Sequence, residues 1–148
     1  MLAATIIQAN LAAIGIKANI LPQDSGPFWD MGQESKGEVW KDLELWIMRY
    51  GSGADPYEPF QWFVRGQVGI WNWERWSDDE FEALYAEGIV SSDSKRRNEI
   101  YIRMQEIMEN TGNYVWLTHE AEVYVHRDNL HVDLAPSGET LMLYFKPA

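Results

Sequence analysis

The chain of 148 residues carries 12 basic and 23 acidic side chains, which gives a net charge of −11 at neutral pH. This negative surplus repels phosphate backbones, so nucleic acid is not expected as a partner. The sequence has no cysteine, which excludes disulfides, thiolate nucleophiles and sulfur-ligated metals. Its hydrophobic content of 46% is ordinary for a globular protein, and we expect one domain over residues 1–148.

The N-terminal part of the sequence predicts a helix, a strand and a second helix. Apolar residues recur at three- and four-residue steps over residues 2–14, and Gly15 follows as a stop. Alternation over residues 16–20 is typical of a strand. A short helix is expected to carry Phe28 and Trp29.

A central strand is predicted at residues 43–48, where the run is largely apolar. A glycine-containing loop follows, and Asp55 and Pro56 then form the typical start of a helix that continues to about Val64. Helices alternating with strands in this way indicate an α/β fold.

The C-terminal half predicts two further helices and three strands. Residues 77–80 resemble a capping box that begins a helix. A longer helix is expected at residues 94–110, with Gly112 as its stop. Its predicted buried face consists of Ile100, Met104, Ile107 and Met108. The predicted strands are residues 114–117, 122–126 and 141–145.

Tryptophan is unusually frequent, with eight copies in the chain. Three of them, Trp71, Trp73 and Trp76, fall within six residues of an expected loop, where no helical or strand core pattern explains all of them. Because tryptophan is enriched where proteins contact ligands and partners, at least one is expected to meet a ligand or partner.

The search for catalytic and metal-binding patterns gives one weak candidate. Asp55 and Glu58 could form a glycosidase-like carboxylate pair, although a helix cap with a first-turn acid explains them equally well. The serine in residues 51–53 does not have the spacing of a hydrolase nucleophile. No zinc signature fits the spacing of His119, His126 and His131. We therefore expect no enzyme activity, no cofactor and no metal.

Five motifs in fixed order resemble the peptide/nickel class, family 5, of extracellular solute-binding proteins that serve ABC importers. These motifs are residues 11–17, 42–46, 55–56 and 76–84, and Arg96-Arg97 with Tyr101 and residues 105–107. Tyr114-Val115-Trp116-Leu117 resembles the strand that follows in that family.

The resemblance implies a C-terminal portion of a much longer, two-lobed protein, chiefly its second lobe. The implied fold is part of a type II periplasmic-binding-protein-like lobe, with a mixed sheet and flanking helices. The implied partners are a small-molecule or peptide solute, the N-terminal lobe of the same protein, and an ABC permease. The full protein would be periplasmic or extracellular.

The resemblance also implies a solute-binding site. In the peptide-binding branch, an acid four residues before the proline of Asp-Pro pairs with the peptide amino group, and a tryptophan lies three residues earlier. Here these positions hold Ser52 and Arg49. We therefore expect an anionic or neutral polar solute, since an arginine can bind a carboxylate. The expected ligand-binding residues are Arg49, Tyr50, Ser52, Asp55, Asn72 and Trp73, with Asp55 serving more as a helix cap.

Two alternatives stay open at this stage. One is a small carbohydrate-active enzyme that uses Asp55 and Glu58 with tryptophan platforms. The other is an inactive lobe that only folds and associates. If the chain is a lobe that lacks its partner lobe, whether or not it binds a solute, the apolar surface left exposed would favour a homo-oligomer.

Overall fold

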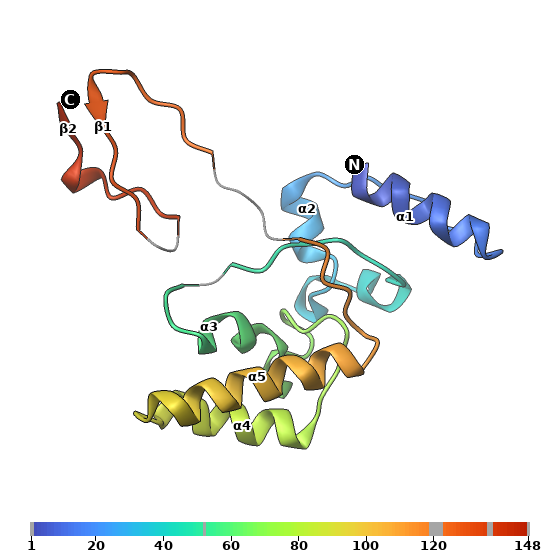
Figure 1. Cartoon of the computed structure of the whole chain (residues 1–148). Helices are drawn as coiled ribbons and strands as arrows, with labels where there is room; N and C mark the ends of the chain where they lie inside the picture. The colour runs from blue at the N-terminus through green and yellow to red at the C-terminus, as the bar shows by residue number, and fades with distance from the viewer. Residues whose placement is uncertain (1, 52, 119–122, 136–137, 148) are drawn as a thin grey trace.

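The computed structural model of the chain consists mainly of helices and loops (Figure 1). It describes residues 2–51, 53–118, 123–135 and 138–147. The α-helices are α1 (Leu2–Ala13), α2 (Ser25–Asp30), α3 (Tyr57–Phe60), α4 (Asp79–Val90) and α5 (Ser94–Asn110). Short 3-10 helices are η1 (Glu34–Lys36), η2 (Val39–Asp42), η3 (Gln61–Phe63), η4 (Arg65–Gln67) and η5 (Met142–Tyr144).

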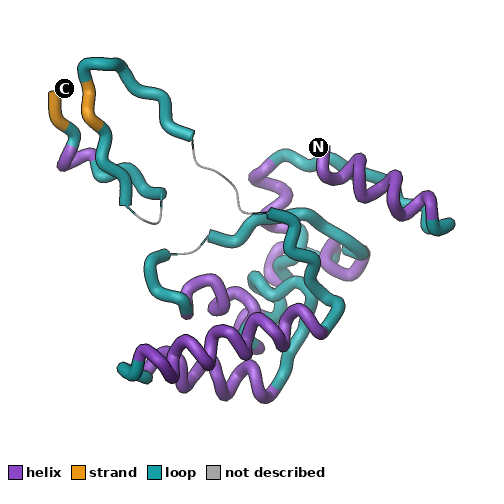
Figure 2. Tube along the Cα trace, in the orientation of Figure 1, coloured by secondary structure: helices purple, strands orange, loops and turns teal. Residues whose placement is uncertain are grey.

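The expected α/β fold with a mixed sheet is wrong. In the described ranges the one sheet consists of β1 (Leu130–His131) and β2 (Lys146–Pro147), which pair antiparallel. The segments predicted as strands at 16–20, 43–48 and 114–117 are loops (Figure 2). Apolar alternation identifies a chain that can form a strand, but a strand also needs a hydrogen-bonded neighbour.

The two remaining strand predictions fail as well. Residues 123–126 are loop, and residue 122 lies outside the described residues. The segment 141–145 contains η5, whose backbone closes turns between Met142 and Phe145 and between Leu141 and Tyr144. Local hydrogen bonding has replaced strand pairing there.

The helix predictions are confirmed where the pattern and the caps agree. The helix after residue 77 forms as predicted, but its cap lies one residue later than the expected box: the Asp78 carboxylate accepts the Phe81 N–H at 2.8 Å and starts α4. Asp93 caps α5 by accepting the N–H groups of Lys95 and Arg96. The predicted buried face of α5 is buried, and Gly112 follows it at φ +70°. Such side-chain caps stabilise a helix by about 1 kcal/mol each.

The core lies between α4, α5 and the turn formed by α3 and η3. Its buried side chains are Phe60, Phe63, Trp76, Phe81, Ile100, Tyr101, Met104, Ile107 and Met108. Phe60 stacks on Tyr101 with ring centroids 5.6 Å apart, and Trp76 meets Phe81 edge-on at 4.8 Å. We call residues 71–76 the tryptophan-rich segment. Trp76, at the C-terminal end of this segment, is part of the core and so anchors the segment there.

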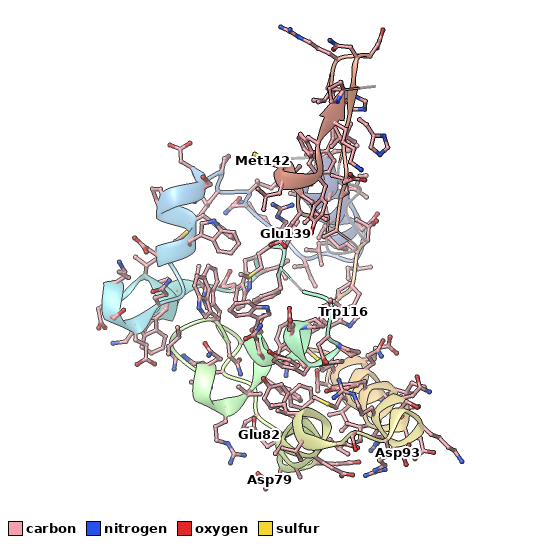
Figure 3. All side chains as sticks on the ribbon, turned by 90° about the vertical axis from the view of Figure 1, so that its left-hand side faces the viewer. Asp79, Glu82, Asp93, Trp116, Glu139 and Met142 are labelled. Carbon is pink, nitrogen blue, oxygen red and sulfur yellow. The ribbon has the colours of Figure 1, made fainter. Side chains whose placement is uncertain are left out.

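Acidic side chains gather at one end of the molecule. Figure 3 shows Asp79, Glu82 and Asp93 at the end formed by α4 and α5, whereas Met142 lies near the opposite end and Trp116 lies between. Residues 1–16 contain no charged side chain. No described helix is both long and apolar enough to cross a membrane.

Candidate functional site

A pocket of about 330 Å³ lies between α2, η3, the loop after residue 48 and the tryptophan-rich segment. We call it the aromatic pocket; it is lined by Trp29, Arg49, Tyr50, Gly51, Trp62 and Trp71. Three indoles and a phenol offer flat surfaces for stacking, and a guanidinium can bind an anionic group in a bidentate manner. Apolar walls with one specific polar group are typical of small-molecule sites.

The walls of the aromatic pocket are held in place before any ligand binds. The Trp62 indole N–H donates to the carbonyl of Gly51 at 2.9 Å, and the Tyr50 hydroxyl donates to the carbonyl of Trp71 at 3.1 Å. The Trp71 ring is edge-on to both Trp29 and Trp62, with centroids 6.0 Å apart in each pair. A preformed wall reduces the entropy lost on binding.

The position of Trp62 follows from its neighbours in the sequence. Phe60 and Phe63 are three residues apart, so they share one face of the turn and enter the core. Trp62 is thereby left on another face, half-buried beside the pocket. Tyr50 packs edge-on against Phe63 at 4.7 Å, which anchors the loop to the same core.

Asn72 is a structural residue in the fold and does not line the pocket. Its side chain is completely buried, and its amide nitrogen donates to the carbonyls of Phe63 at 2.9 Å and Trp76 at 2.8 Å. Its amide oxygen accepts the N–H of Trp76 at 3.2 Å. Asn72 therefore fastens the tryptophan-rich segment to η3, and this places Trp71 at the pocket.

Trp73 also points away from the pocket. Its ring is 7% exposed and packs against Phe28 at 5.5 Å and Trp46 at 5.9 Å. The indole N–H donates to the carbonyl of Ile70 at 3.1 Å. The ring lies so close to Gly32 that a Cβ at that position would overlap it.

Asp55 serves the loop and the first turn of α3. Its carboxylate accepts the N–H of Tyr57 at 3.1 Å and pairs with the Arg97 guanidinium at 2.6 Å. Arg97 also donates to the carbonyl of Gly88 at 2.9 Å, so the pair joins this loop to α4 and α5. Ser52, the remaining expected site residue, lies outside the described residues.

Of the expected site residues that the structure describes, Arg49 and Tyr50 line the aromatic pocket. Sequence reasoning missed Gly51, Trp29, Trp62 and Trp71. The spacing of Phe60 and Phe63 is a signal that could have identified Trp62. For Trp71, only the crowding of tryptophans indicated that one of them contacts a ligand, and it did not indicate which.

Behind the pocket lies a group of interacting titratable side chains. Burial raises the pKa of Glu74 to about 6, and one of its carboxylate oxygens makes no hydrogen bond with the described residues. Burial, followed by the negative charge of Glu74, raises the pKa of both Tyr50 and Tyr114. A negative charge on Glu74 is therefore unfavourable in the folded chain.

We expect stability to fall as the pH rises from about 4.5 to about 6, because the folded chain holds the Glu74 proton more tightly than the unfolded chain does. Glu74→Gln removes this step. At pH 7 the variant should be more stable than the wild type, by at most about 2 kcal/mol, and at pH 4 the two should match. Urea unfolding at several pH values measures this. Glu109→Gln, at an exposed position of α5, is the control and should keep the wild-type pH dependence. If the free energy of unfolding of Glu74→Gln changed with pH as much as that of the wild type, the assignment to Glu74 would be contradicted.

No group of three or more His, Asp or Glu side chains suited to a metal ion occurs among the described residues. The lining of the aromatic pocket offers stacking, apolar contact and one guanidinium. Comparisons with protein-family models, with curated proteins and with solved structures found no match for this chain.

Proposed function

We propose that this chain is a non-catalytic binding module that holds a small solute in the aromatic pocket for uptake by an ABC importer. The observation that carries the binding part is the pocket itself, with its ordered aromatic walls and its arginine. The order of the sequence motifs supports the transport part. In this proposal the partners are a second lobe and a membrane permease, and the protein works in the periplasm or outside the cell.

The lining favours a solute with a flat ring and a carboxylate. Trp29, Trp62 and Trp71 provide stacking and edge contacts in several orientations. Among the described lining residues only Arg49 is charged, and its side chain is exposed. A peptide ammonium group would meet a positive charge at this position, which disfavours free-amine peptides.

We expect Arg49→Ala to weaken the binding of a ring-bearing carboxylate at least about tenfold, because a charge-assisted hydrogen bond contributes about 1.5–3 kcal/mol. Indole-3-acetate is a suitable probe, and its neutral amide, indole-3-acetamide, is the matched ligand control. Isothermal titration calorimetry measures both affinities. The wild type should prefer the carboxylate, and Arg49→Ala should lose that preference.

The control variant is Arg65→Ala. Arg65 is also an exposed arginine; it lies beside Asp79 at the start of α4 and does not line the pocket. Both variants should melt within a few degrees of the wild type, as surface substitutions usually do. Equal affinities of the wild type and Arg49→Ala for the carboxylate, or tight binding of simple di- and tripeptides, would contradict the proposal.

The rival carbohydrate-active enzyme has no observation in its favour. Its nucleophile or acid would be Asp55, whose carboxylate is already paired with Arg97 and bonded to the backbone of α3. Hydrolysis of a chromogenic glycoside by the purified chain would reverse this preference.

A further inference from the structure

A second pocket lies in the C-terminal part of the chain, at the hairpin formed by β1 and β2 (Figure 1). Its volume is about 390 Å³, and we call it the hairpin pocket. It is lined by Arg127, Asn129, Leu130, Phe145, Lys146 and Pro147. The aromatic pocket is lined by other residues, so the two pockets are separate features of the molecule.

Strand pairing brings the two cations of the hairpin pocket together from distant positions in the sequence. β1 and β2 are antiparallel, with Leu130 opposite Pro147 and His131 opposite Lys146. The Leu130 N–H donates to the carbonyl of Arg127 at 3.0 Å, and this turn holds Arg127 next to β1. Arg127 and Lys146 therefore line one pocket, although they are far apart in the chain.

Both of these cations lack an acidic partner. Neither Arg127 nor Lys146 forms an ion pair with any described residue. Asp133, which follows β1, pairs instead with His131 at 3.3 Å. Asp128 is next to Arg127 in the chain, but it is exposed and does not line the pocket. Arginines elsewhere in the described part of the chain do pair with carboxylates: Arg65, Arg75, Arg96, Arg97 and Arg103.

Two unpaired cations beside one pocket create a local attraction for an anion. The chain holds 23 acidic side chains against 12 basic ones, so most cations can be neutralised within the molecule. Where two cations share a pocket whose lining contains no acid, their charge stays available to a bound ligand.

The lining favours a ligand with two negative charges and an apolar group. A phosphomonoester carries close to two negative charges at neutral pH. A guanidinium binds its oxygens in a bidentate manner, and an ammonium adds a second positive charge. The side chains of Leu130 and Phe145 are half-buried and, together with Pro147, provide an apolar wall for the organic group of the ester.

We propose that the hairpin pocket binds a small phosphomonoester with an apolar organic group. Arg127 and Lys146 hold the phosphate, and Phe145 contacts the organic group. This site does not depend on the proposed solute binding, because the two pockets share no lining residue.

Isothermal titration calorimetry of the full chain with phenyl phosphate, near neutral pH and at low salt, tests the proposal. We expect the wild type to bind phenyl phosphate, to bind inorganic phosphate more weakly because it has no ring, and not to bind the uncharged phenol. Arg127→Ala and Lys146→Ala should each weaken the binding of phenyl phosphate at least about tenfold. Both side chains are exposed, so neither substitution disturbs the core.

Lys95→Ala is the matched control. Lys95 is exposed in the first turn of α5 and does not line the hairpin pocket, so this variant should bind phenyl phosphate like the wild type. Arg49→Ala is a second control, because phenyl phosphate also has the ring and the charge that suit the aromatic pocket. The amide chemical shifts of residues 129–131 and 145–146 should move during the titration in the wild type and in Arg49→Ala alike.

Three results would overturn the proposal. The first is a wild type that does not bind phenyl phosphate, or binds phenol equally well. The second is an unchanged affinity in both Arg127→Ala and Lys146→Ala. The third is the loss of the chemical shift changes in Arg49→Ala, which would place the probe in the aromatic pocket. Failure of indole-3-acetate to bind would contradict the proposed function and leave these expected results as they are.

Discussion

Asn72→Ala should lower the free energy of unfolding by at least about 3 kcal/mol, the largest effect that we expect of any substitution near the pocket. The Asn72 amide bonds to the carbonyls of Phe63 and Trp76 and to the N–H of Trp76, and its side chain has no exposed surface. Alanine would leave these three backbone groups buried without a partner. Each such group costs about 1–3 kcal/mol.

Urea denaturation followed by circular dichroism measures the loss. The matched control is Asn98→Ala, at an exposed position of α5, which should change stability by no more than about 0.5 kcal/mol. The pocket should also suffer, because Trp71 directly precedes Asn72. A loss below about 1 kcal/mol for Asn72→Ala would mean that water reaches the backbone groups or that Asn72 is not the fastener of this segment.

Gly32→Ala should destabilise the chain by about 3 kcal/mol, at the upper end of the usual cost of overpacking. The new methyl group would overlap the indole of Trp73. That ring is confined by Phe28 and Trp46 and by its hydrogen bond to Ile70, so it cannot move aside without disturbing its contacts. Thermal unfolding monitored by tryptophan fluorescence measures the loss of stability. The emission of the folded variant reports the change in indole environment that a displaced Trp73 ring would cause.

Gly26→Ala is the control for this substitution. Gly26 lies in α2, and a Cβ there meets no atom within 4 Å. Since alanine favours helix over glycine by up to about 1 kcal/mol, this variant should be neutral or slightly stabilised. Equal stability of Gly32→Ala and Gly26→Ala would show that Trp73 has room to move.

Helices could be predicted from this sequence because their signals are local. For α5, the predicted apolar spacing and the Gly112 stop lie within one short stretch and perform the expected role, and the structure adds Asp93 as the N-cap. The same holds for the helix that ends before Gly15, whose φ is +84°. A helix satisfies its own backbone, so no information about distant residues is needed.

Strands were predicted from equally clear patterns and were wrong. Segment 43–48 does place alternate side chains on the protein, as its sequence indicates. Whether such a segment becomes a strand depends on a neighbour whose backbone accepts and donates hydrogen bonds, and a pattern within one segment does not report that neighbour.

The candidate site was only partly predictable, for a related reason. Arg49 and Tyr50 were expected from the resemblance of the central loop, and both line the pocket. The choice among the tryptophans failed because Asn72 and Trp73 look like ligand contacts in sequence but are buried by packing. Trp73 is buried partly because its indole packs directly against Gly32, which lies about forty residues earlier in the chain. A pattern within residues 71–76 does not report that contact.

The helices α4 and α5 hold a local surplus of negative charge. Residues 78–109, from the start of α4 to the end of α5, hold nine acidic and four basic side chains, whereas residues 1–16 hold none. In the field of one copy, the acidic pole of another is turned away before contact. Two copies are thus disfavoured from approaching through α4 and α5, and ions in solution screen this repulsion over a Debye length of about 8 Å at physiological salt. The acidic helices therefore bias, at a distance, which surfaces collide.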